Sequence, residues 1–248
     1  EAVNEHMQAL QKSFFREKRK KSYAPFSKDL TTEEIDGIMN RSMRQTDRYR
    51  EMKKKGVSEN EIRTAFNTPV SMRVFSYDGL IDTTMTPMDS IRWNKHFLRC
   101  GFMSMDAHSG AVKAYVGGPN FTHFQYDMVT TGRRQVGSTI KPYLFTLAMD
   151  EGMWPCDSTV NDFITLIDGN GVRWTPRDEH LENQGEMVTL NWGLEKSSNW
   201  ITAYLMGKLS PYQLKRLIHS FGVKNQQIDP VVSLCLGPCE ISVGEMVS

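Results

Sequence analysis

A serine and a lysine three positions apart, Ser138 and Lys141, are the residues of this sequence best suited to catalysis. In a helical segment this spacing places both side chains on one face, so that the amine can reach the hydroxyl. A serine becomes a good nucleophile only when a base takes its proton, and a lysine is such a base when burial or nearby positive charge lowers its pKa. The pair therefore predicts a serine nucleophile activated by a lysine.

The residues around the pair predict where the chain places it. Gly137 permits a tight turn and the close approach of a ligand. Pro142 is tolerated only in the first turn of a helix, so Ser138 is expected at a helix N-terminus. Backbone N–H groups and the helix dipole stabilise a developing oxyanion there. The nearly all-apolar run 143–149 predicts that this helix continues into the core. Arg133 and Arg134 could lower the pKa of Lys141 or pair with a carboxylate.

The stretch around the Ser138–Lys141 pair and a second stretch downstream carry a family resemblance. The run 134–142 reads Arg-Gln-Val-Gly-Ser-Thr-Ile-Lys-Pro, and the run 195–199 reads Glu-Lys-Ser-Ser-Asn. Together they resemble the active-serine and Ser-x-Asn motifs of the penicillin-binding proteins, in particular the class A bifunctional members. Two strands around a Ser-Gly turn, ending in Gly117-Gly118, are similar to the hairpin that opens the family's transpeptidase sheet. The segment 236–246 is similar to the one that precedes the family's third motif, Lys-Thr/Ser-Gly, which this sequence lacks.

The resemblance implies an α+β fold of the penicillin-binding transpeptidase and serine β-lactamase type. A helical subdomain and an antiparallel sheet, incomplete here, would occupy residues 99–248, after a smaller helical and β linker module over residues 1–98. It also implies a role for each residue that matches a motif. These residues are the acylated nucleophile Ser138, its base Lys141, the proton relay Ser197, and the substrate-binding Asn199, Gln135 and Gly137.

The activity implied is that of a peptidoglycan D,D-transpeptidase. The D-Ala-D-Ala end of a stem peptide would acylate Ser138, D-Ala would leave, and an amine of a neighbouring stem peptide would resolve the acyl-enzyme. β-Lactams would acylate the same serine, and proteins of cell-wall synthesis and division are implied as partners. No cofactor and no metal are implied. The third motif supplies an oxyanion donor, and losing one donor costs about a hundred- to a thousand-fold in rate. We therefore expect the chain, if truncated before that motif, to be weak or inactive.

Other activities stay open on the sequence alone. The same motifs serve D,D-carboxypeptidases and serine β-lactamases, although the long charged segment before residue 99 disfavours a compact β-lactamase. A non-catalytic β-lactam-binding or scaffold module would retain the fold. A serine-protease triad of Ser138 with Asp106 and His108 is possible by composition, but Asp106 and His108 are better interpreted as turn residues.

Composition restricts the class of protein further. The chain has 248 residues, 39% of them hydrophobic, and a formal net charge of +1, which gives no reason to expect nucleic acid as a partner. No apolar run is long enough for a transmembrane helix, and no signal peptide is visible. The first residue is Glu1, so we expect the true N-terminus to be missing. Class A relatives carry a glycosyltransferase domain and a membrane anchor before this region. The resemblance therefore implies a location on the periplasmic face of the bacterial cell membrane. The four cysteines favour free thiols or one disulfide over a metal site.

The remaining patterns predict the elements that surround the motifs. A helix is expected early in residues 1–26, ending in the basic run 16–21, which is either a solvated helix end or a contact with an anionic membrane. Two helices are expected in 31–66, with capping boxes at Thr31 and Ser58. Residues 67–98 are expected to be β, with a turn at Asp78-Gly79. The other expected elements are a hairpin turn at 168–171, a helix over 190–208 interrupted at 197–199, and a helix over 211–222.

Overall fold

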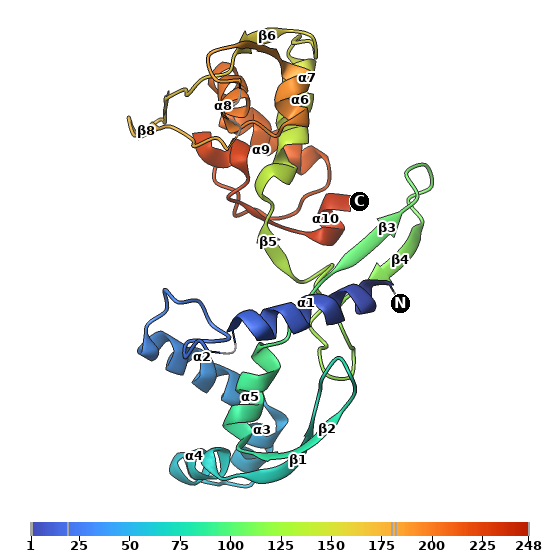
Figure 1. Cartoon of the computed structure of the whole chain (residues 1–248), viewed down its shortest axis with the longest axis vertical. Helices are drawn as coiled ribbons and strands as arrows, with labels where there is room; N and C mark the ends of the chain where they lie inside the picture. Colours follow the sequence, from blue (N-terminus) through green and yellow to red (C-terminus); the bar gives the residue numbers. More distant parts are fainter. Residues whose placement is uncertain (1, 19, 180, 182, 248) are drawn as a thin grey trace. The chain divides into compact units, whose positions relative to one another are not determined.

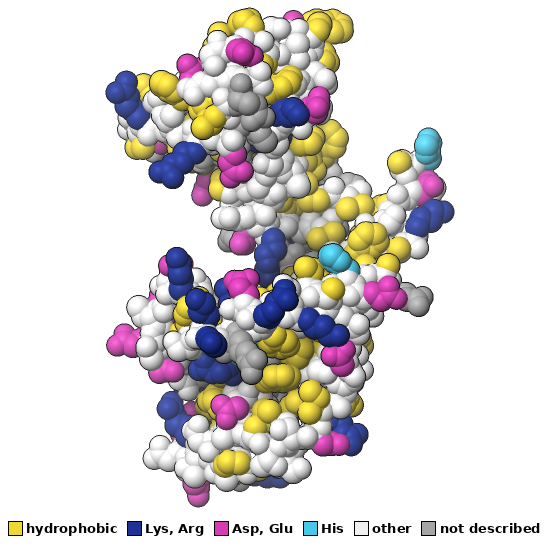
Figure 2. All heavy atoms as spheres, in the orientation of Figure 1, with side chains coloured by type: hydrophobic (Ala, Val, Ile, Leu, Met, Phe, Trp, Pro, Cys, Tyr) yellow, Lys and Arg dark blue, Asp and Glu magenta, His cyan; other side chains and the backbone are white. Residues whose placement is uncertain are grey.

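The computed structural model describes residues 2–18, 20–179, 181 and 183–247 (Figure 1). Glu1 and Arg19, which belong to the sequence-based expectations above, lie outside the described residues. The chain forms two compact units that interleave along the sequence. The first is Glu1–Cys100 with Pro119–Gln125, and the second is Gly101–Gly118 with Tyr126–Ser248. Lys and Arg side chains are interspersed with Asp and Glu on the face drawn in Figure 2, in keeping with the small net charge.

The first unit is mostly helical and contains one β-hairpin. Both predicted capping boxes are present: Thr31 and Glu34 cap one helix, and Ser58 and Glu61 cap another. Its elements are α1 (Ala2–Lys18), α2 (Thr32–Gln45), α3 (Asp47–Lys54), α4 (Glu59–Asn67), β1 (Val70–Val74), β2 (Ile81–Met85) and α5 (Pro87–Lys95). No helix among the described residues of the whole chain has both the length and the apolar character needed to cross a membrane.

Two expectations for this unit were wrong in detail. The region 31–66 holds three helices instead of two, because Thr46 adopts an extended conformation (φ −73°, ψ 148°) and its hydroxyl caps the next helix by accepting from the Tyr49 N–H. The region 67–98 is not β throughout, because Thr86 caps α5 and Pro87 lies in its first turn. A proline in that position has a φ already suited to helix and loses no hydrogen bond.

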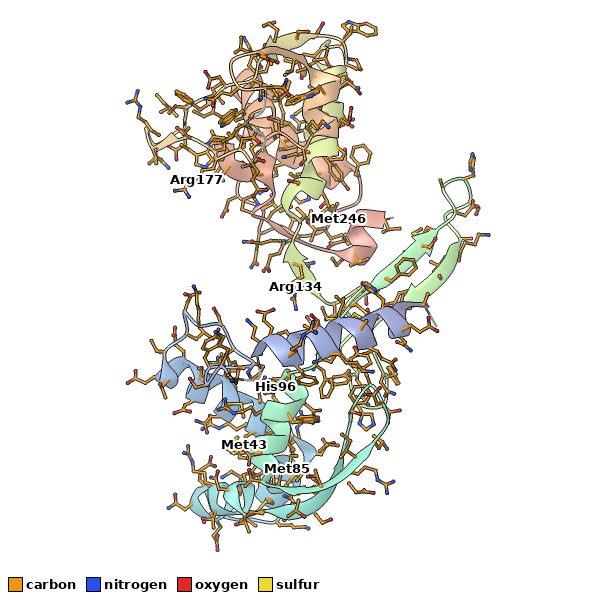
Figure 3. The ribbon with its side chains drawn as sticks, viewed as in Figure 1. Met43, Met85, His96, Arg134, Arg177 and Met246 are labelled. Carbon is orange, nitrogen blue, oxygen red and sulfur yellow. The ribbon has the colours of Figure 1, made fainter. Side chains whose placement is uncertain are left out.

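The core of the first unit consists of two separate clusters. One joins the completely or almost completely buried Met43 (labelled in Figure 3), Ile62 and Phe66. The other is aromatic and contains Phe75, Phe97 and Phe124. The ring centroids of Phe75 and Phe124 lie 5.0 Å apart in an edge-to-face arrangement, which is favourable for aromatic pairs. Phe124 therefore ties the segment Pro119–Gln125 to the first unit.

The second unit combines helices with short antiparallel strand pairs, as expected for an α+β fold. The strands before the first buried helix are β3 (Phe102–Met105), β4 (Val112–Val116) and β5 (Arg133–Gln135). The helices are η1 (Gly137–Ile140, a 3-10 turn), α6 (Lys141–Asp150), α7 (Leu190–Glu195), α8 (Asn199–Lys208), α9 (Pro211–Ser220), η2 (Val232–Leu236) and α10 (Val243–Val247). The remaining strands are β6 (Ser158–Val160), β7 (Leu166–Ile167), β8 (Arg173–Trp174), β9 (Met187–Thr189) and β10 (Glu240–Ser242).

Several predicted elements of this unit are confirmed. β3 pairs with β4 around the Ser-Gly turn, and β7 pairs with β8 around the turn at 168–171. The predicted helix over 190–208 is interrupted at Ser197, as expected, and continues as α8. The structure leaves all four cysteines as free thiols, with Cys235 and Cys239 buried.

Helix α6 lies in the main core of the second unit. Its residues Leu144, Leu147 and Ala148 are 0%, 5% and 0% exposed, and they belong to one cluster with residues of α8, α9 and η2. A helix that is apolar on nearly every face is stable only when it is enclosed by other elements. The N-terminus of α6, where Lys141 begins the helix, is therefore held on a rigid support.

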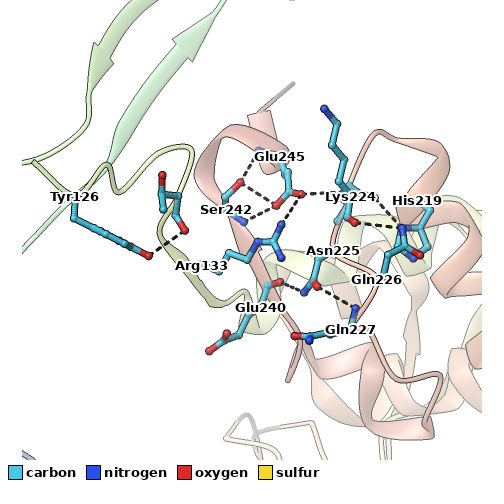
Figure 4. Close-up of polar contacts among 12 residues, drawn as sticks. Tyr126, Arg133, His219, Lys224, Asn225, Gln226, Gln227, Glu240, Ser242 and Glu245 are labelled. Atoms are coloured by element: carbon cyan, nitrogen blue, oxygen red, sulfur yellow. Dashed lines mark hydrogen bonds and ion pairs between the residues drawn. The ribbon is translucent and has the colours of Figure 1, made fainter. Parts of the chain in front are cut away.

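The strand that leads into this helix is anchored by the C-terminal part of the chain. Strand β10 pairs antiparallel with β5, and Glu245 accepts from the backbone N–H groups of Ser242 (3.0 Å) and Lys224 (2.9 Å) (Figure 4). The Arg133 guanidinium in β5 lies 3.6 Å from the same carboxylate. The start of the Ser138 turn is thereby fixed to β10 and α10.

Candidate active site

The chain reverses sharply where Ser138 is presented. Gly137, in the left-handed region at φ +54°, donates its N–H to the carbonyl of Gly237 (3.0 Å). The preceding Val136 N–H donates to the carbonyl of Cys239 (3.1 Å). Ser138 then occupies η1 with an exposed side chain, and Pro142 lies in the first turn of α6, as expected. The serine is thus at the N-terminal end of a buried helix.

Lys141 is buried beside the Ser197–Asn199 turn. Its side chain is 1% exposed, and its ammonium donates to the Ser197 carbonyl oxygen, to Ser197 Oγ (3.0 Å) and to Asn199 Oδ1 (2.8 Å). A protonated lysine has three N–H donors, and all three are used here. The two motifs recognised in the sequence therefore meet at this amine.

No hydrogen bond joins Ser138 to Lys141 in the described structure, although their spacing would let the amine reach the hydroxyl. Within the described part of the chain, the Ser138 hydroxyl makes no hydrogen bond. The reason is that all three N–H groups of the ammonium already donate hydrogen bonds to Ser197 and Asn199. Loss of one proton would give the amine a lone pair, which is what a base needs in order to accept the proton of Ser138.

Burial is the main influence on the pKa of Lys141. The pKa is lowered from the ordinary lysine value because burial penalises the charged form, whereas the nearby Asp178 and Cys235 oppose this shift. Arg133 and Arg134, which the sequence suggested as possible causes, do not contribute to the shift. Arg133 instead takes the other suggested role and pairs with the Glu245 carboxylate. The low polarity around Lys141 favours a neutral amine.

The turn that receives Lys141 is strained at one residue. Ser197 has φ +55°, the only non-glycine residue with a positive φ among those the structure describes. It follows α7, where the Ser197 N–H donates to the Leu194 carbonyl (3.0 Å) and the Ser198 N–H donates to the Gly193 carbonyl (2.8 Å). Ser198 then caps α8 by accepting from the Ile201 N–H (3.2 Å). Such strain persists only where the surrounding structure imposes it, and it is frequent at functional sites.

The other candidate residues lie as follows. Gln135 is in β5, exposed, and paired in register with Glu240 of β10. Asp106 accepts from the N–H groups of His108 (3.2 Å) and Ser109 (2.8 Å), so its carboxylate caps the β3–β4 turn. Asp106 is thus bonded to the backbone of His108, whereas a catalytic triad requires a bond to the imidazole ring.

Sequence reasoning missed the residues that hold the site from behind. Asp178 Oδ2 accepts from Ser198 Oγ (2.7 Å) and from the Trp200 N–H (3.0 Å). The carbonyl of Arg177, which is labelled in Figure 3, accepts from Asn199 Nδ2 (2.7 Å). Both residues come from a turn-rich stretch whose pattern carries no catalytic signal. In the sequence, Gly237 was noted only as part of a family-like segment. Its role becomes visible in the structure, where its backbone lies against that of Gly137.

Two models of known protein families match this chain. Residues 100–230 match the family model of the penicillin binding protein transpeptidase domain, and residues 21–98 match that of the penicillin-binding protein middle domain. Penicillin-binding protein 1A of Neisseria lactamica is 30% identical over 155 residues, which are 60% of this chain and 19% of the relative. Penicillin-binding protein 1A of Rickettsia typhi is 31% identical over 147 residues, 59% of this chain and 18% of the relative. The chain thus matches about a fifth of the length of these relatives.

A solved structure supports the fold. The crystal structure of penicillin-binding protein 1A from Haemophilus influenzae aligns with 97% of this chain and 40% of its own length, at a TM-score of 0.56 and 17% sequence identity. The α+β transpeptidase fold expected from the sequence is confirmed, and so is the resemblance on which it was based. The chain therefore belongs to the penicillin-binding proteins, with a match to their middle domain followed by a match to their transpeptidase domain.

Proposed function

We propose that this chain contributes to peptidoglycan cross-linking as a serine D,D-transpeptidase and that Ser138 is its acylated residue. One observation supports this above the others: a lysine with a lowered pKa is buried one helical turn after an exposed serine and is bonded to both Ser197 and Asn199. A buried base beside an accessible hydroxyl is the arrangement that makes serine nucleophilic. The transpeptidase-domain match supports the same reaction class.

The proposed first step is acylation. The neutral Lys141 amine accepts the proton of Ser138 Oγ, directly or through Ser197, while Oγ forms a bond to the carbonyl carbon of the penultimate D-Ala of a stem peptide. The resulting oxyanion faces the N-terminal end of the Ser138 turn, where backbone N–H groups stabilise negative charge. Ser197 then passes a proton to the departing amine of the terminal D-Ala, and the C–N bond breaks.

The proposed second step transfers the acyl group. An amine of a neighbouring stem peptide attacks the ester carbon and gives up a proton to the Lys141–Ser197 pair. The C–Oγ bond then breaks, and that proton passes to Ser138 Oγ, which leaves as a free hydroxyl. Asn199 would hold the peptide backbone of the substrate, and Gln135 and Gly137 would line the same edge of the site. A β-lactam would enter the first step and form an ester that the second step resolves slowly.

The cellular setting belongs to this proposal as well. The names of the curated relatives support a place in a larger penicillin-binding protein. In that setting the transpeptidase would act on the periplasmic face of the membrane, anchored by a helix outside this sequence. It would work with a glycosyltransferase domain of the same protein and with other proteins of cell-wall synthesis.

Mass spectrometry after incubation with penicillin tests the proposal. We expect the intact mass to rise by one drug molecule and the adduct to map to the tryptic peptide 135–173, which contains Ser138 because trypsin does not cut between Lys141 and Pro142. The same incubation is carried out on the full-length protein, and its extent of adduct formation is the reference if this chain reacts slowly. An unmodified full-length protein would overturn the proposal, and rapid hydrolysis of penicillin without an adduct would favour a β-lactamase.

The pH dependence of acylation should report the state of Lys141. Burial lowers its pKa, and only the neutral amine can act as a base, so the rate should rise as the pH passes through the lowered pKa. The midpoint should lie below the ordinary lysine value of about 10.4. The measurement is the second-order rate of labelling by a fluorescent penicillin from about pH 6 to about pH 10. A midpoint at the ordinary lysine value would show that burial does not tune this amine.

A further inference from the structure

A short loop before β9 is bonded at four points to the turn that receives Lys141. Asp178 Oδ2 accepts from the Ser198 hydroxyl (2.7 Å) and the Trp200 N–H (3.0 Å). The carbonyl of Arg177 accepts from Asn199 Nδ2 (2.7 Å), and the Pro176 carbonyl accepts from the Trp200 indole N–H (3.1 Å). The four bonds connect residues 176–178 to residues 198–200.

These bonds determine how Asn199 faces the lysine. Its amide has one acceptor oxygen and one donor nitrogen. Because Nδ2 donates to the carbonyl of Arg177, Oδ1 is left to accept from Lys141 Nζ at 2.8 Å. A flipped amide would place two N–H groups against a cation and would lose both bonds. The loop therefore sets the orientation in which Asn199 receives the amine.

The residues that Asp178 contacts are almost completely buried. Ser198 is 0% exposed and Trp200 is 6% exposed. Ser198 uses its hydroxyl proton for Asp178 while its oxygen accepts from the Ile201 N–H (3.2 Å) at the start of α8. A hydrogen bond from a buried hydroxyl or a buried N–H to a charged acceptor is stronger than one to a neutral acceptor. The carboxylate therefore fixes the start of α8 and the strained turn immediately before it.

Asp178 also acts on Lys141 through its charge. Burial lowers the pKa of Lys141, and Asp178 is the largest opposing influence, followed by the buried Cys235 of η2. Among the described residues, these two are the ionisable groups that shift this amine. The remaining groups bonded to it, the Ser197 carbonyl and hydroxyl and the Asn199 amide, are neutral.

We propose that Asp178 is a positioning residue of the site, which holds the Ser197–Asn199 turn in the geometry that receives Lys141 and supplies the negative charge that balances the buried ammonium. It touches neither Ser138 nor any reacting atom in this scheme, and it acts through its bonds to Ser198 and Trp200 and through its charge. The consequence for acylation rests on the function proposed above. The consequence for the turn itself does not, and it can be measured without any substrate.

Two substitutions separate the positioning role from the charge. In Asp178→Asn the amide oxygen can still accept from Ser198 and Trp200, but the negative charge is gone. In Asp178→Ala both are lost. Asp168→Asn is the matched control, since Asp168 caps only its own hairpin by accepting from the N–H groups of Asn170 (2.9 Å) and Val172 (2.8 Å).

The first measurement is hydrogen exchange at the backbone and indole N–H groups of Trp200 by ¹⁵N NMR. We expect exchange of the backbone N–H to be at least about tenfold faster in Asp178→Ala, because its bond to the carboxylate is lost. Exchange of the indole N–H should rise with it, since its acceptor, the Pro176 carbonyl, lies in the same loop. In Asp178→Asn, whose amide oxygen is a weaker acceptor, the rise should be smaller, and in Asp168→Asn exchange should stay near the value of the unmodified chain. Unchanged exchange in a folded Asp178→Ala variant overturns the positioning role.

The second measurement is the pH profile of acylation. Removing the charge of Asp178 removes an interaction that favours the ammonium, so the pKa of Lys141 falls and the rising limb in Asp178→Asn moves to lower pH. An unmoved limb overturns the role of the charge. If Asp178→Ala does not fold, Asp178→Asn still tests the role of the charge through the position of this limb, and its Trp200 exchange still tests the positioning role. If no variant and not even the unmodified full-length protein is acylated, the proposed function fails, while the exchange of Trp200 still reports on the turn.

Discussion

Ser138→Ala is expected to remove the covalent penicillin adduct completely. Alanine has no nucleophilic atom, and the neighbouring hydroxyls are engaged: Thr139 Oγ1 donates to the Val136 carbonyl (2.6 Å), and Ser197 Oγ accepts from Lys141 Nζ (3.0 Å). Loss of a catalytic nucleophile typically costs on the order of a million-fold in rate. The intact mass after incubation with penicillin should therefore equal that of the untreated protein.

The same substitution should leave the fold intact. The Ser138 side chain is exposed and makes no hydrogen bond to another described residue, so the loss of stability should stay within about 0.5 kcal/mol. Ser158→Ala is the matched control, because Ser158 is an exposed serine in the same tryptic peptide. It should keep the full adduct. An adduct that persists in Ser138→Ala but disappears in Ser158→Ala would move the nucleophile to the other serine.

Gly237→Ala should damage both stability and acylation, although Gly237 is far from Ser138 in the sequence. A β-carbon on Gly237 would lie 2.2 Å from the carbonyl oxygen of Gly137 and 2.7 Å from its nitrogen. These are backbone atoms, so no change of rotamer can relieve the clash, and the turn that carries Ser138 must move. Misplacing a catalytic group by about 1 Å can cost a hundredfold in rate. We expect acylation to fall by about that factor, together with a clear drop in melting temperature.

Gly110→Ala separates steric clash from backbone strain. Gly110 has φ +68°, almost the same as the +69° of Gly237, but a β-carbon there would meet nothing within 4 Å. Its cost should be limited to the left-handed conformation, about 1–2 kcal/mol, with acylation unchanged. If Gly110→Ala slowed labelling by fluorescent penicillin as much as Gly237→Ala does, the apposition of Gly237 with Gly137 would not be the cause.

The parts of the site that depend on neighbours in sequence could be predicted well. Ser138 and Lys141 lie in one stretch, and the apolar run after them marks a buried helix, so their placement at its N-terminal end followed from local pattern alone. The interruption at Ser197 was predictable for a similar reason, because polar residues break an apolar helical repeat. Capping boxes at Thr31 and Ser58 are likewise local, since each joins residues three positions apart.

The contacts between distant segments could not be predicted from local pattern, and only the family resemblance placed Ser197 and Asn199 in one site with Lys141. The bond from Asp178 to Ser198 spans 20 residues, and the bonds of Lys141 to Ser197 and Asn199 span 56 and 58. No periodicity encodes such pairs. Spacing places Ser138 and Lys141 on one turn, but it does not reveal that partners from another turn occupy the amine. Helix α5 was missed because its nine residues are too few to establish a clear helical repeat.

Phe124 has a consequence for the order in which the chain can fold during synthesis. The aromatic cluster of the first unit contains Phe75 and Phe97, but it also needs Phe124, which the ribosome adds only after the hairpin of β3 and β4. A domain folds as a unit once all of its segments are available. The first unit is therefore incomplete while that hairpin, which belongs to the second unit, has already emerged. The first unit can therefore complete its folding only after part of the second unit has been synthesised, because of the single short segment Pro119–Gln125.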